Sequence, residues 1–177
     1  MGAEHDAEIT CDGVGTAIHD GGMCTTARDL ARFGAMMLAG GEGAGRRVVP
    51  ATWLRESWSV PPDIRDAFAR SVFEPCLPGG WYRNKFWFVP RDHGDVLLCL
   101  GIHGQMLYVN PGTGTVAVKL SSWPDAQSPT MLHDTVLAFD AVGAALAGIA
   151  AGDPSRRHGP PGVVAGLSRG RIGGSRQ

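Results

Sequence analysis

The stretch LLCLGIHGQMLYVNPGTGTVAVKL, residues 97–120, decides the fold of this chain. Apolar and aromatic side chains recur at every second position on both sides of residues 101–105, which is typical of β-strands. The residues at 110–114, Asn-Pro-Gly-Thr-Gly, fix φ or accept a positive φ, so they predict a tight turn between two paired strands. The stretch therefore predicts a β-hairpin, with a glycine-bracketed histidine where the preceding strand ends.

Strands and helices extend the pattern on both sides. An aromatic run that favours β-structure ends at Pro90 and indicates a further strand. Apolar residues at helical spacing follow three helix-start signals: the two threonines near position 25, Pro50, and the Ser-Pro pair at 128–129. We expect antiparallel strands at 85–89, 96–100, 105–109 and 115–121, and helices at 25–40 (capped by Thr25 or Thr26), from Pro50, and at 128–147. The first and last helices are expected to cover one face of the sheet. The predicted fold class is α+β, an antiparallel sheet flanked by helices.

Composition excludes several classes of function. The net charge of −1 gives no electrostatic case for binding nucleic acid or an acidic membrane surface. The N-terminus lacks a secretion signal, and the longest apolar stretch, residues 141–151, is shorter than the roughly 20 residues that cross a bilayer, so we expect a cytoplasmic protein. The four cysteines show no metal-site spacing; we expect reduced, partly buried thiols and neither a metal nor a cofactor.

The C-terminal segment has a different composition from the rest of the chain. Residues 151–177 are rich in Gly, Pro, Ser and Arg, and we expect them to form a disordered tail after a domain at 1–150. The tail contains Gly-Leu-Ser-Arg-Gly at 166–170, which matches a nucleophile elbow by letter. Because no strand, following helix or downstream histidine accompanies it, a glycine-rich tail is the preferred interpretation.

The segments 21–34, GGMCTTARDLARFG, and 46–54, RRVVPATWL, carry a resemblance to a known family. Together with the tryptophan–tyrosine pair at 81–82, the aromatic run at 85–88 and the turn at 101–105, they closely resemble the C-terminal half of serine β-lactamase-related hydrolases. Within that group the chain looks most like the 6-aminohexanoate-dimer hydrolase branch and related class C-like esterases. The resemblance covers roughly residues 2–147.

The resemblance implies a β-lactamase/DD-peptidase-like (transpeptidase-like) fold, here incomplete, and a cleft at the turn. In the family this strand end lines the cleft opposite the serine nucleophile, and one backbone amide completes an oxyanion hole. The resemblance places that amide at Ile102, with Gly101 and Gly104 lining the cleft because close approach of the backbone needs small residues. His103 then lies beside the pocket and is expected to orient the substrate or a catalytic tyrosine.

Alternatives remain open for the histidines and for Trp87. His103 is equally a candidate for a hydrogen-bonded structural residue at a strand end. Trp87 is a candidate cleft wall, although an aromatic residue on a half-buried strand is more often part of the core. His133 is a further cleft candidate, although its place early in the last helix favours an exposed surface residue, and Asp29 is expected only to cap its helix.

One departure from the family pattern bears on activity. The family attacks its substrate with the serine of a Ser-x-x-Lys motif, and no serine of this chain has a lysine three residues later. Tyr82-Arg83-Asn84 matches the Tyr-x-Asn of penicillin-recognising enzymes, but it lies too close to the 101–105 turn, so a strand-entry aromatic is preferred.

Three hypotheses follow for the function. The first is the C-terminal portion of a serine hydrolase, acting on a small-molecule amide or ester substrate in the complete enzyme and inactive alone. The second is one chain of a split hydrolase, in which a separate polypeptide supplies the missing N-terminal segment. The third is a non-catalytic binding module that uses the sheet to hold a peptide or peptidoglycan fragment.

Overall fold

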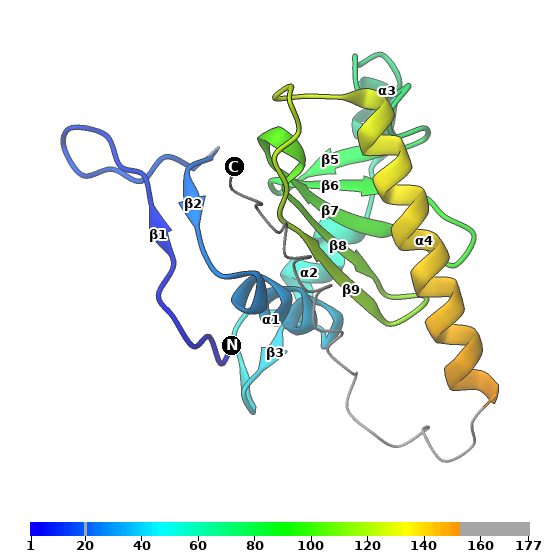
Figure 1. Ribbon diagram of the computed structural model, residues 1–177, viewed down its shortest axis with the longest axis horizontal. Helices are drawn as coiled ribbons and strands as arrows, with labels where there is room; N and C mark the ends of the chain where they lie inside the picture. Colours follow the sequence, from blue (N-terminus) through cyan, green and yellow to red (C-terminus); the bar gives the residue numbers. More distant parts are fainter. Residues whose placement is uncertain (20, 153–177) are drawn as a thin grey trace, which may run out of the picture.

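A five-stranded antiparallel sheet forms the centre of the computed structural model, which describes residues 1–19 and 21–152 (Figure 1). Its strands are β5 (Trp81–Arg83), β6 (Phe86–Val89), β7 (Val96–Leu100), β8 (Met106–Asn110) and β9 (Thr115–Lys119). Each strand pairs with the next one in sequence, so the sheet is a simple meander. The four predicted strands are therefore confirmed, in the predicted antiparallel succession. The last one ends at Lys119 instead of residue 121.

Four helices of the described part lie around this sheet. They are α1 (Ala27–Leu38), α2 (Ala51–Trp58), α3 (Pro62–Ala69) and α4 (Pro129–Gly152), and a short 3-10 turn, η1 (Ile102–Gly104), lies between β7 and β8. Two small hairpins complete the described part: β1 (Glu8–Ile9) with β2 (Met23–Cys24), and β3 (Glu42–Gly43) with β4 (Arg46–Arg47). The prediction missed β5 and α3, and α3 begins at a Pro-Pro pair whose second proline suits the first turn of a helix.

The two faces of the sheet are covered by different helices. Leu97 and Leu107 lie in a cluster with Met36 and Met37 of α1, whereas the adjacent strand residues face the α4 side. That second cluster holds Leu98, Met106, Tyr108 and Val136. The expectation that α1 and α4 share one face is therefore wrong. Consecutive apolar residues in β7 and β8 supply side chains to both faces, so each face needs its own helical layer.

The beginning of α1 follows its sequence signal. The hydroxyl of Thr26 accepts a hydrogen bond from the Asp29 amide at 3.1 Å, which confirms Thr26 as the N-cap. Gly34 lies against the sheet, where a Cβ atom would stand 2.6 Å from Val116 Cγ1. The missing side chain thus lets α1 approach β9 closely.

α4 packs on the sheet through one stripe of side chains. Val136 is fully buried, and the Phe139 ring meets the Tyr108 ring at 5.5 Å. By length and composition alone, the segment Pro129–Gly148 would suffice to cross a membrane, and little of it is buried. A single helix of this kind is weak evidence for a membrane span, because the core helix of a soluble protein passes the same test. The absence of a membrane span and the cytoplasmic location both stay predictions.

The predicted C-terminal tail lies largely outside the described residues. α4 continues through Gly152, five residues beyond the expected end of the last helix. The remaining part of the predicted tail, residues 153–177, and with it the Gly-Leu-Ser-Arg-Gly match, lies outside the residues that the structure describes.

Candidate functional site

Residues 101–105 form the turn that joins β7 to β8. The Gly101 amide donates to the Gln105 carbonyl at 2.9 Å, and the His103 amide donates to the Ala126 carbonyl at 2.9 Å. Among the hydrogen bonds between described residues, none uses the amide of Ile102, a residue that is 62% exposed. The turn thus offers one uncommitted backbone donor at the end of a central strand.

The two glycines of the turn are needed for different reasons. Gly104 has φ +80°, and a Cβ atom there would stand 2.3 Å from Cε2 of Trp123. Gly101 has φ −113°, which any residue adopts, and its nearest neighbour would be Gln105 Cβ at 3.0 Å. Gly104 is therefore fixed by the contact with Trp123, a structural cause that the sequence did not indicate.

A mainly apolar cavity of about 180 Å³ lies beside this turn, between the sheet and the start of α4. Its lining includes four of the predicted site residues: Trp87, Gly101, Ile102 and Gly104. The other large side chains around it are Phe73, Leu77, Leu100, Met106, Trp123 and Leu132. The structure therefore brings the proposed amide donor and an apolar pocket together.

Trp87 belongs both to this pocket and to the core. It is half-buried in the α4-side cluster, and its ring lies 4.7 Å from the ring of Phe73 and 4.7 Å from that of Tyr82. The two interpretations of Trp87 are thus compatible, because one edge of a packed aromatic ring also walls the cavity.

The two candidate histidines are not part of the lining. His133 is exposed on α4. His103 is half-buried, and its ring Nδ1 lies 2.9 Å from the main-chain carbonyl of Trp123. Because a carbonyl only accepts, Nδ1 carries the proton in this contact. His103 is therefore tied to the segment that follows β9.

That following segment contains the residues that the sequence interpretation missed. Lys119 donates from Nζ to the Gly104 carbonyl at 3.2 Å and to the Ser121 hydroxyl at 2.6 Å, and Nζ lies 4.2 Å from the centre of the Trp123 ring. Burial lowers the pKa of Lys119. A lysine close to two serines and a Trp-Pro pair at a strand end was the available signal, but the contact of Lys119 with the turn, at the Gly104 carbonyl, joins residues 15 positions apart.

The Tyr-x-Asn match is a structural feature of β5. Arg83 forms an ion pair with Glu56 of α2 at 2.9 Å, and the Asn84 side chain donates to the Ser57 hydroxyl at 2.8 Å. The Tyr82 ring packs against the Trp87 ring at an interplanar angle of 59°. These contacts fit the preferred interpretation of a strand-entry aromatic.

Buried titratable groups on the sheet have structural partners. Burial raises the pKa of the Tyr108 phenol, which donates to Asp140 Oδ1 of α4 at 2.7 Å. Burial also raises the pKa of the Cys99 thiol to about 12, so this thiol stays protonated at neutral pH. All four cysteines are free; Cys11 and Cys24 are exposed, which corrects the expectation of partly buried thiols at those two positions.

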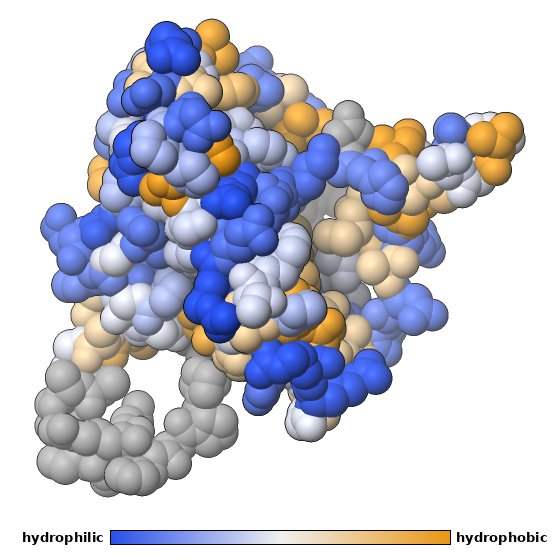
Figure 2. Space-filling model, turned by 180° about the vertical axis from the view of Figure 1, so that it is seen from behind, coloured by the Kyte–Doolittle hydropathy of each residue, from blue (hydrophilic) through white to orange (hydrophobic). Residues whose placement is uncertain are grey.

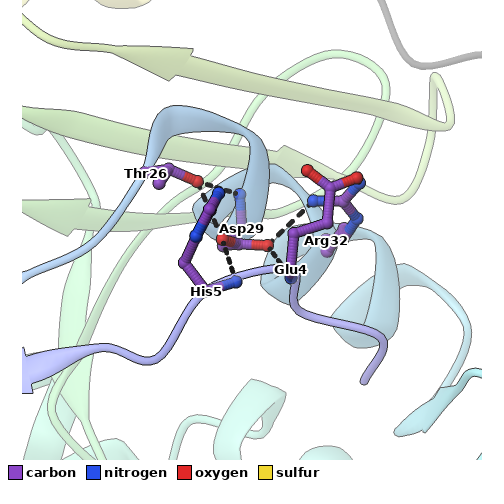
Figure 3. Close-up of polar contacts among 5 residues, drawn as sticks. All are labelled: Glu4, His5, Thr26, Asp29 and Arg32. Carbon is purple, nitrogen blue, oxygen red and sulfur yellow. Dashed lines mark hydrogen bonds and ion pairs between the residues drawn. The ribbon is translucent and has the colours of Figure 1, made fainter.

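A second polar cluster surrounds the carboxylate of Asp29 at the start of α1 (Figure 3). It accepts from the Glu4 amide at 2.8 Å, the His5 amide at 3.2 Å, the Thr26 hydroxyl at 2.8 Å and the Arg32 guanidinium at 2.8 Å. These donors, the Glu4 amide foremost, lower the pKa of Asp29 to about 2. Asp29 therefore does more than cap its helix, because it fastens the N-terminal segment to α1.

The described part of the chain contains no cluster of side chains suited to bind a metal ion. Within residues 1–19 and 21–152, no three His, Cys, Asp or Glu side chains are grouped so that they could hold a metal ion.

Comparison with known proteins identifies relatives of this chain, although no family model matches it. It is 40% identical over 149 residues to the 6-aminohexanoate-dimer hydrolase of Paenarthrobacter ureafaciens, a match that covers 80% of this chain and 37% of the relative. The solved structure named "Putative 6-aminohexanoate-dimer hydrolase from Bacillus anthracis" superposes with a TM-score of 0.65 at 26% identity, covering 82% of this chain and 35% of that one. The chain thus spans little more than a third of the length of either relative. It is a homologue of part of the 6-aminohexanoate-dimer hydrolase of Paenarthrobacter ureafaciens, with the mixed helix and antiparallel-sheet architecture expected from its sequence.

Proposed function

We propose that this chain forms one wall of the active site of a serine hydrolase that cleaves an amide or ester bond next to a linear aliphatic acyl chain. The uncommitted Ile102 amide carries the proposal. Donors that are fixed before the reaction stabilise the oxyanion of acyl transfer, and removal of one such donor typically costs a factor of about 10²–10³ in kcat. The Ile102 amide lies at the end of a central strand and is bonded to no described residue, and Ile102 as a whole is 62% exposed.

The neighbouring cavity supports the choice of acyl group. Its volume of about 180 Å³ is slightly larger than the roughly 150 Å³ apolar cavity that holds a six-carbon ring. Its walls are mainly aliphatic and aromatic, so they favour methylene groups over charged ones. The relative from Paenarthrobacter ureafaciens is named for a dimer of 6-aminohexanoate, an acyl unit of six carbons.

The nucleophile has to come from polypeptide beyond these 177 residues. The sequence holds two lysines, Lys85 and Lys119, and the residue three positions before each is not a serine. We infer a β-lactamase/DD-peptidase-like fold for the complete enzyme, in which a helical part brings a Ser-x-x-Lys motif opposite Ile102. On this proposal the chain alone has no turnover.

Exposed apolar side chains favour the idea that further polypeptide packs on this chain. Ile9, Val14 and Met23 are exposed on the hairpin of β1 and β2, which projects from the body of the molecule (Figures 1 and 2). Leu137 and Val142 are about half exposed on α4. The same surfaces would serve the second candidate function, a non-catalytic module that binds another protein or a peptide.

A chimera separates the two candidates. This chain replaces the matching 149-residue stretch of the Paenarthrobacter ureafaciens enzyme, and hydrolysis of p-nitrophenyl hexanoate and p-nitrophenyl acetate is measured for the chimera and for the chain alone. The hydrolase proposal predicts turnover by the chimera with a preference for the six-carbon ester, and none by the chain alone. A folded chimera without turnover supports the binding module instead. Equal rates on the two esters would refute the assignment of the cavity to the acyl chain.

A further inference from the structure

We propose that His103 is a positioning residue, which holds the turn 101–105 so that the Ile102 amide faces outward. His103 holds the turn through the hydrogen bond that its ring Nδ1 donates to the Trp123 carbonyl. The inference rests on the proposed function, because it concerns the placement of the amide that the function requires.

The backbone of His103 is held at both of its polar groups. Its amide donates to the Ala126 carbonyl at 2.9 Å, and its carbonyl accepts from the Trp123 amide at 3.1 Å. The backbone of His103 has φ +55°, a conformation that residues other than glycine rarely adopt. Such a backbone persists only where surrounding contacts fix it, and such positions cluster at functional sites.

The ring of His103 adds a third contact to the same segment. Since Nδ1 donates to the Trp123 carbonyl, the neutral ring leaves Nε2 without a proton. His103 thus makes three hydrogen bonds to residues 123–126, two through its backbone and one through its ring. This places the histidine behind the turn, where it acts on the amide of Ile102 through the connecting peptide.

The rest of the turn is held by neighbouring contacts. Ser121 donates from its hydroxyl to the carbonyls of His103 and Gly104, each at 2.9 Å, and its amide donates to the Gln105 side-chain carbonyl at 3.2 Å. The Gln105 side chain in turn donates from Nε2 to the Ser121 carbonyl. Residues 103–105 are therefore fixed by contacts with residues 121–126. The amides of Ile102 and Gly104 have no described acceptor, and of these two residues only Ile102 is exposed.

Substitutions at position 103 test this role on the full 177-residue chain by NMR. Asn retains an N–H donor at the distance of Nδ1 from Cβ and tolerates positive φ, whereas Gln places its donor one bond farther, nearer to Nε2. For His103→Asn we expect an Ile102 amide signal at the native position. For His103→Gln and His103→Ala we expect a displaced Ile102 signal and exchange of the residue-103 and Trp123 amides on the order of tenfold faster.

The tautomer of the unmodified protein gives a second measurement. Nitrogen shifts of the His103 ring are expected to show the Nδ1–H form in the neutral state, and this result does not depend on any variant folding. An Nε2–H form would overturn the proposal, as would an Asn variant that behaves like the Ala variant. Both readouts are independent of hydrolysis, so an inactive chimera would refute the proposed function and leave the positioning role to be decided by NMR alone.

Discussion

The central strands and the N-terminal segment of this chain are held in place by different forces. Leu97, Leu98 and Tyr108 are fully buried, because helices cover both faces of the sheet. Residues 1–19 and 21–24 by contrast are mostly exposed, and the carboxylate of Asp29 binds the backbone of this segment at Glu4 and His5. The sheet therefore has a core of its own. The N-terminal segment touches that core with Met1 and is otherwise tied to α1 by polar contacts that pH and substitution can remove.

The largest effect is expected from truncation of a core side chain. Leu97→Ala should lower the free energy of unfolding by about 2–5 kcal/mol, because it leaves a cavity between the sheet and α1. Ile9→Ala in the N-terminal hairpin, where the side chain is 46% exposed, should change it by less than about 0.5 kcal/mol. Denaturant titration of both variants measures the difference. Equal losses would show that the hairpin belongs to the same cooperative core.

A smaller effect is expected at the turn between β7 and β8. Gly104→Ala meets both a positive φ and the Trp123 ring, whereas Gly114→Ala meets a positive φ of +65° with no atom within 4 Å. We therefore expect Gly104→Ala to destabilise the protein by about 1–3 kcal/mol more than Gly114→Ala. Thermal and denaturant unfolding of the pair tests this. A difference near zero would mean that Trp123 moves aside freely, which would weaken the account of the turn as a fixed element.

The smallest and most local effect is expected from acid. The hydrogen bonds to Asp29 lower its pKa from the ordinary value of 3.8 to about 2, so the carboxylate stabilises the attached segment above pH 4 and loses this effect as the pH falls toward 2. Hydrogen exchange of the Glu4 and His5 amides should accelerate over that range, while amides of β8 stay protected. Asp29→Asn should show fast exchange at neutral pH and no such acid transition. An unchanged Asn variant would contradict the role of the carboxylate.

Much of the sheet was predictable, because its strands carry strong local signals. The turn at 110–114 and the runs at 97–100 and 106–109 predicted the hairpins. The placement of the helices on opposite faces was not foreseen, since a run of consecutive apolar residues on a strand does not say which helix covers which face. β5 was missed because it has three residues, too few for a periodic pattern.

The sequence named residues that lie around one cavity, but not the contacts that shape the turn beside it. The resemblance named Ile102 and its glycine neighbours, and the structure places three of them beside one cavity with Trp87. The contacts that shape the turn come from Lys119, Ser121 and Trp123. Lys119 ends the last strand of the sheet, and Ser121 and Trp123 follow it. Their contacts with the turn form by tertiary packing, for which no local sequence pattern exists.

The central claim is that the Ile102 amide serves as an oxyanion donor, and one pair of rates tests it most directly. Ile102→Pro removes that N–H, and the extended Gly101 before it (φ −113°, ψ 162°) accepts a following proline; Ile102→Ala keeps the N–H and removes the side chain. In the chimera we expect the Pro variant to lose about 10²–10³-fold in kcat on p-nitrophenyl hexanoate and the Ala variant to stay within about tenfold of the parent. Equal kcat values for a folded Pro variant and the Ala variant would contradict the claim.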